Sequence, residues 1–164
     1  MMTNTKRRGH CRTQTVMIAF LSALSTGCGS DLVRPEPALR VQEILVTDAS
    51  SGELVAYSHQ DHWHGVLRQR TGESRALSLH FTSSTRPPSE HEAPPRTEWF
   101  TLDTLPAYQL RVVVEDTAVA RWTGAAAGGS LSATRGGATY VNFVVRRGTT
   151  TIFEAPPLGL GVTP

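Results

Sequence analysis

Three of the six histidines of the chain lie in residues 59–65, His-Gln-Asp-His-Trp-His-Gly. His62 and His64 are two positions apart, so on a strand their imidazoles project from the same face. That spacing suits zinc or copper, which bind neutral imidazole nitrogens. His59 has the opposite strand parity, and it joins the pair only if the backbone turns at Gln60 and Asp61, as these residue types allow.

The spacing leads to the hypothesis of a zinc- or copper-binding site whose ligands are His59, His62 and His64. Asp61 is either a further ligand or a carboxylate that orients one of the imidazoles. His91 is set aside as a ligand, because it lies in a separate proline-rich segment. Calcium is disfavoured, because the stretch lacks the cluster of carboxylates that this ion requires.

A purely structural role for the same stretch remains open. In this alternative Tyr57 and the histidines form a polar corner whose imidazoles bond to backbone carbonyls, and Trp63 anchors the stretch in the core. A catalytic zinc additionally requires a nearby general base, and only Glu53 and Asp61 are close in sequence. No Gly-x-Ser-x-Gly nucleophile motif is present either. The sequence therefore predicts a protein that is not an enzyme.

Short strands must position these residues, because the chain from residue 41 onward shows strand signals and no sustained helical period. Residues 76–81 alternate in character, with Leu77, Leu79 and Phe81 on one face and His80 on the other. About nine such strands, separated by turn residues, predict an all-β fold, an antiparallel β-sandwich.

One segment interrupts the strand pattern. Residues 83–97 contain two Pro-Pro pairs among polar and charged residues, which predicts an exposed loop between strands rather than a domain boundary. Trp99 and Phe100 follow it and return the chain to the core. As an aromatic edge beside the loop, these two residues are also a candidate surface for an envelope protein or a glycan.

The first 27 residues predict an export signal. Four basic residues precede the apolar run at residues 16–24, which is too short to span a bilayer. Residues 25–28, Ser-Thr-Gly-Cys, then resemble the lipobox of bacterial lipoproteins, in which the cysteine is acylated with fatty acids such as palmitate. Ser25 departs from that pattern, which has a branched apolar residue three places before the cysteine. An ordinary secretory signal is the alternative, and both interpretations export the chain.

The lipobox resemblance implies that Cys28 carries a lipid anchor that holds the mature chain to a membrane of the cell envelope. Gly29 rather than aspartate follows the cysteine, which implies sorting to the outer membrane. Residues 28–38 then form a tether with two prolines. Residues 39–164 have the length of a single domain.

Removal of the signal reverses the apparent charge of the chain. Four of the 16 Lys and Arg and none of the 14 Asp and Glu lie in the first 27 residues, which leaves 12 basic against 14 acidic residues and a net charge of −2. This balance gives no case for binding nucleic acid. Cys11 and Cys28 are the only cysteines, so the mature domain has no disulfide and is held together by packing alone.

Part of the second half resembles the group-2 bacterial immunoglobulin-like (Ig-like) domain. The matching features are residues 116–120 (DTAVA), a small strand at 131–133 (LSA), and a glycine-bearing turn and alternating strand at 135–141 (RGGATYV). The resemblance implies an Ig-like β-sandwich of a kind used in adhesion and as a spacer, with no catalytic residues.

The front half resembles a group of uncharacterised exported lipoproteins that share Ala-Tyr-Ser-His and Asp-His-Trp-His-Gly, here residues 56–59 and 61–65. In those proteins histidines also occur in the turn before the last strand, whereas this chain has residues 146–151, Arg-Arg-Gly-Thr-Thr-Thr. If those proteins bind metal at both places, this chain keeps half of the site. The expected function is a non-catalytic interaction or structural module of the envelope, and the alternative is a copper- or zinc-binding envelope lipoprotein.

Overall fold

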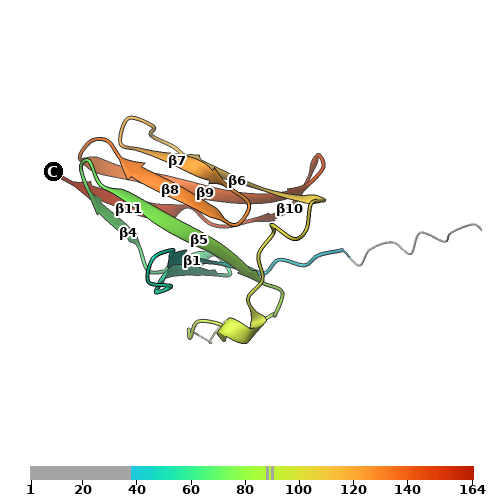
Figure 1. Ribbon diagram of the computed structural model, residues 1–164. Coiled ribbons are helices and arrows are strands. Elements are labelled where there is room, and N and C mark those ends of the chain that lie inside the picture. The colour runs from blue at the N-terminus through green and yellow to red at the C-terminus, as the bar shows by residue number, and fades with distance from the viewer. Residues whose placement is uncertain (1–37, 88, 90) are drawn as a thin grey trace, which may run out of the picture. The chain divides into compact units, whose positions relative to one another are not determined.

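Strands make up most of the folded chain (Figure 1). The computed structural model describes residues 38–87, 89 and 91–164, so the predicted signal peptide and Cys28 lie outside the described residues. The described part belongs to one compact unit, and the all-β prediction is confirmed. Its elements are β1 (Glu43–Asp48), β2 (Leu54–His59), β3 (His62–His64), β4 (Leu67–Arg70), β5 (Ser74–Thr82), the short 3₁₀ helix η1 (Arg96–Glu98), β6 (Tyr108–Val114), β7 (Ala120–Ala125), β8 (Gly128–Ala133), β9 (Gly137–Arg147), β10 (Thr150–Glu154) and β11 (Leu158–Thr163).

The strands form two sheets. The first has the order β3-β2-β1-β5-β8-β7, and the second has the order β10-β9-β11-β4, with β6 also paired to β9. All pairs are antiparallel except β4 and β11, which run parallel, with Leu67 opposite Leu160. The predicted antiparallel β-sandwich is confirmed, and this parallel pair is its exception. The chain leaves the first sheet after β3 and crosses to the second within two residues, so β4 enters beside β11 in the same direction.

The core lies between the inward faces of the two sheets. The predicted alternation of β5 is confirmed, because Leu77, Leu79 and Phe81 are buried in one cluster. Phe143 and Val145 of β9 supply part of the other side of that cluster. Burial of such apolar side chains stabilises the fold by about 1.5–3 kcal/mol each, which is the packing that a domain without disulfides requires.

The first sheet is also buried on its outer face along β1. Ile44 and Val46 belong to the core between the sheets, and Leu45 points to the opposite face because side chains of a strand alternate. Leu45 is nevertheless fully buried. Its neighbours across the strands on that outer face are Tyr57 and His80. Something outside the two sheets must therefore cover this face.

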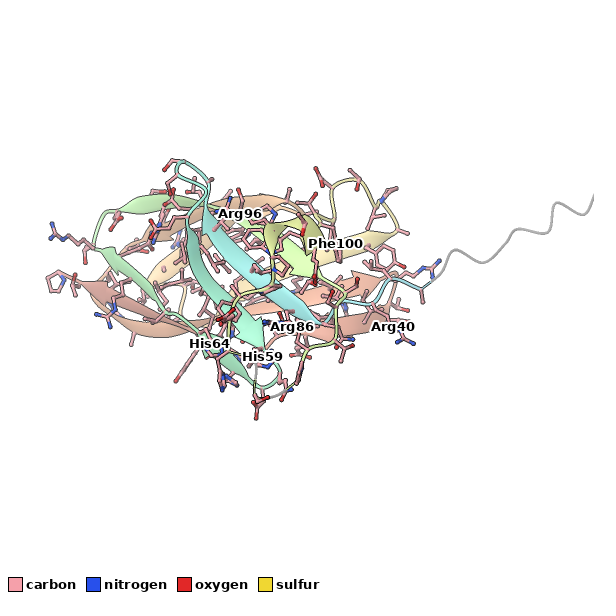
Figure 2. The ribbon with its side chains drawn as sticks, turned by 90° about the horizontal axis from the view of Figure 1, so that it is seen from below. Arg40, His59, His64, Arg86, Arg96 and Phe100 are labelled. Carbon is pink, nitrogen blue, oxygen red and sulfur yellow. The ribbon has the colours of Figure 1, made fainter. Side chains whose placement is uncertain are left out.

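The cover is the proline-rich segment. The described residues from Ser83 to Phe100, called the cover segment below, place Arg86 against Glu43 and Trp99 against His80, with 5.2 Å between the His80 and Trp99 ring centroids. Figure 2 shows Arg86 beside His59 and His64. Most residues of the segment are exposed, as the sequence predicts, but its inner side chains close the outer face of the sheet.

The pH dependence of stability tests whether the Asp48 carboxylate stabilises the turn between β1 and β2. The Asp48 carboxylate accepts hydrogen bonds from the Ser50 hydroxyl, from Arg75 Nε at 2.8 Å and from the turn amides. These bonds, the Ser50 hydroxyl first, hold the pKa of Asp48 well below its usual value. A carboxyl whose pKa is lower in the folded state stabilises the fold above its unfolded pKa of about 3.9 and loses that contribution as the pH falls.

We therefore expect the urea midpoint to fall between about pH 5 and pH 2, and to fall less in Asp48→Asn, which has no charge to lose. Glu154→Gln, at an exposed position of β10, is the control. Identical pH profiles for the wild type and Asp48→Asn would show that the Asp48 carboxylate is not the source of this pH dependence.

Candidate metal centre

A tight hairpin carries the histidine stretch. Strands β2 and β3 pair antiparallel with Tyr57 opposite His64 and His59 opposite His62, so the chain turns at Gln60 and the residue after it. Gln60 has a positive φ of 53°, a conformation more often taken by glycine or asparagine. The predicted turn is therefore present. It places the rings of Tyr57, His59, His62 and His64 on one face of the hairpin.

His62 and His64 converge as their spacing predicts. Their Nε2 atoms are 3.0 Å apart, and the ring centroids are 4.7 Å apart. The shared face of a strand with period two is sufficient to bring these nitrogens together.

The third nitrogen comes from His91, in the cover segment. His91 Nδ1 lies 3.4 Å from His64 Nε2, and one ligand atom from each of His62, His64 and His91 lies within 4.8 Å of the others. The structure thus brings His91, which the sequence analysis set aside, beside His62 and His64. Its contact partner is 27 positions away, and no local pattern indicates where an irregular segment folds back.

His59 is not a member of this group of three. It is buried, its Nδ1 lies 2.6 Å from Glu43 Oε1, and its Nε2 lies 3.2 Å from the carbonyl oxygen of Pro87. Both ring nitrogens thus have partners within the protein. Of the predicted ligands, the structure brings His62 and His64 together and places His59 apart from them. The surroundings of His59 match the structural alternative, with a ring nitrogen against a backbone carbonyl.

Asp61 is placed to orient an imidazole. Its side chain is 96% exposed and its Oδ1 lies 3.2 Å from His62 Nδ1. The hydrogen bond to His62 is also the first cause of the lowered pKa of Asp61. A carboxylate on Nδ1 fixes the tautomer that leaves Nε2 of His62 free for an ion.

Tyr57 connects two of the histidines. Its ring stacks on His64 with 4.6 Å between centroids and 13° between planes, and its hydroxyl donates a hydrogen bond to the carbonyl oxygen of His91. Burial lowers the pKa of His64, and the neighbouring charges of His62 and His91 lower it further. Near neutral pH the imidazole of His64 is therefore uncharged, the form that binds a metal ion.

Trp63 points away from the histidines and into the protein. Its indole N–H donates to the carbonyl oxygen of Pro156 at 2.6 Å, and its ring centroid is 5.7 Å from that of Phe143. Trp63 packs against the main core, so its predicted role as an anchor is confirmed. The anchor matters because β3 has three residues and, among the strands that the structure describes, pairs only with β2.

No protein-family model matches the chain, and a search of curated proteins finds no match. The lipobox, the Ig-like resemblance and the resemblance to other exported lipoproteins therefore stay predictions. Among the residues that the structure describes, no helix is both long and apolar enough to cross a membrane.

Proposed function

We propose that this domain binds a zinc or copper ion through His62, His64 and His91. The observation that carries the proposal is the convergence of three imidazole nitrogens from two separate parts of the chain. Nitrogens bound at ~2.0–2.1 Å to a tetrahedral ion lie about 3.3 Å apart. Two of the three separations, 3.0 and 3.4 Å, bracket that value, and all three ligand atoms lie within 4.8 Å of one another.

The donor set favours zinc and copper over harder ions. The three ligands are imidazole nitrogens, whereas calcium and magnesium require several oxygens. His62 and His91 are exposed, so the remaining coordination position opens to solvent. The nearby carboxylates of Glu43 and Asp61 already have partners, and neither is placed as a general base. Storage, delivery or sensing of the ion therefore fits the site better than catalysis.

We place this activity at the cell envelope. The basic N-terminus, the short apolar run and Ser25-Thr26-Gly27-Cys28 support export and lipidation at Cys28. A tether followed by one domain would hold the three histidines in the solution next to the membrane. If the domain binds no metal, the remaining function is that of a non-catalytic interaction or structural module.

Calorimetric titration with zinc and with copper tests the proposal. The protein is residues 29–164, which retain the whole described unit and its core. We expect saturable binding of one ion per chain, micromolar or tighter, and loss of that binding in His62→Ala/His64→Ala. His91→Ala is expected to weaken binding by at least about tenfold, because it leaves two of three ligands.

His80→Gln is the matched control, because His80 lies on the same face of the sheet but beside Trp99. It is expected to bind as the wild type does. Wild-type titrations that show no saturable heat, or that match those of the double variant, would contradict the metal proposal. Full affinity in His91→Ala would remove His91 from the ligand set.

A further inference from the structure

The position of His91 depends on side-chain contacts rather than on a sheet. Between the end of β5 and Phe100, no described residue of the cover segment pairs with a strand. Strands position His62 and His64 through backbone hydrogen bonds, whereas His91 has no such support. Whatever holds the cover segment therefore decides whether the third ligand is in place.

The first contact that holds the cover segment is a buried ion pair between Arg86 and Glu43. Arg86 Nη2 lies 3.0 Å from both carboxylate oxygens of Glu43, and Arg86 Nε lies 3.1 Å from Oε1. The two side chains are 6% and 3% exposed. Arg86 Nη1 also donates to the carbonyl oxygen of Glu92, the residue after His91. One guanidinium thus joins β1 to the backbone beside the third ligand, and its planar donor set constrains direction as well as distance.

The second and third contacts with the cover segment are made by two residues of β2, His59 and Tyr57. His59 links Glu43 at Nδ1 to the carbonyl oxygen of Pro87 at Nε2. The hydroxyl of Tyr57 donates to the carbonyl oxygen of His91 itself, while the Tyr57 ring lies flat on His64. Tyr57 therefore touches two of the three proposed ligands and fixes the distance between them.

We infer that Tyr57, Arg86 and Glu43 are positioning residues of the metal site, which hold His91 against His62 and His64. None of the three contributes a ligand atom to the group. Contacts that orient ligands in this way typically change metal affinity by about 10–100-fold when removed. The inference rests on the proposed metal binding. It adds that affinity is set by a network beneath the cover segment and not by the three imidazoles alone.

The test measures zinc affinity by calorimetry in Tyr57→Phe, which keeps the stacked ring and removes only the hydroxyl. We expect the dissociation constant to rise about three- to tenfold. Tyr140→Phe is the matched control, because Tyr140 is an exposed tyrosine on β9, and its dissociation constant is expected to be unchanged. Arg86→Met is expected to approach the loss seen in His91→Ala, with exposed Arg68→Met as its control.

A double-mutant cycle separates positioning from general damage to the fold. If Tyr57 acts through His91, then Tyr57→Phe lowers affinity in the wild type but has no further effect in His91→Ala. Equal losses in both backgrounds would overturn the inference. If Arg86→Met does not fold, Tyr57→Phe, which loses only one hydrogen bond, decides the question.

The outcomes also distinguish this inference from the proposed function. A wild-type protein that binds no zinc or copper overturns both. A wild-type protein that binds zinc while Tyr57→Phe and folded Arg86→Met bind equally well leaves the metal site intact and overturns only the positioning network.

Discussion

Replacement of Glu43 by alanine is expected to lower the free energy of unfolding by about 3–5 kcal/mol. The Glu43 carboxylate is shared by Arg86 and His59, and its side chain is 3% exposed. Its removal takes both carboxylate oxygens away from a guanidinium that is 6% exposed. The buried charge of Arg86 then keeps its cost of desolvation but loses the ion pair with Glu43, so the penalty is that of a buried pair broken on one side.

Urea denaturation monitored by tryptophan fluorescence measures this loss. Arg135→Ala is the control, because Arg135 and Asp116 form an exposed pair at 3.8 Å that is worth at most about 1 kcal/mol. Glu43→Leu/Arg86→Met, which removes both charges, is expected to be far more stable than Glu43→Ala. A loss below about 1 kcal/mol in Glu43→Ala would show that water reaches these charges and that the pair resembles a surface salt bridge.

Replacement of Trp63 by alanine is expected to cost about 3 kcal/mol, the lower end of the range for large aromatic side chains, because Trp63 is partly exposed. The change removes the contact with Phe143 and the hydrogen bond to the carbonyl oxygen of Pro156. Since β3 is a three-residue edge strand, loss of this anchor also frees the backbone that carries His62 and His64. We therefore expect zinc affinity to fall together with stability.

Two variants separate these effects. Trp63→Phe keeps an aromatic ring and loses the indole N–H, so a cost of about 1 kcal/mol is expected, with zinc affinity retained. Trp122→Ala removes another partly buried tryptophan, on β7 at the opposite edge of the same sheet, and is expected to lower stability but not zinc affinity. A free energy of unfolding of Trp63→Ala equal to that of the wild type would contradict the role of Trp63 as an anchor.

Local patterns in the sequence were sufficient to predict the strands and the convergence of His62 and His64. The alternation of Leu77, Leu79 and Phe81 predicts one buried face of β5, and the structure confirms it. The same period of two places His62 and His64 on one face and Trp63 on the other. These features need only the geometry of a single strand, so neighbouring residues carry all the information.

The remaining features depend on contacts between distant parts of the chain. The parity of His59 does not show that Glu43 and Pro87 occupy its ring nitrogens, because these partners lie 16 and 28 positions away. Likewise, the composition of residues 83–97 predicts an irregular exposed segment but not the sheet face that it covers.

The sequence by itself therefore determined an all-β chain with one convergent pair of histidines on a strand. Only the tertiary structure decided that His91, and not His59, completes a group of three. The physical reason is that the period of a strand is a local property. The path of the cover segment, by contrast, is set by contacts of the buried Glu43 carboxylate and the Tyr57 hydroxyl with residues far along the chain.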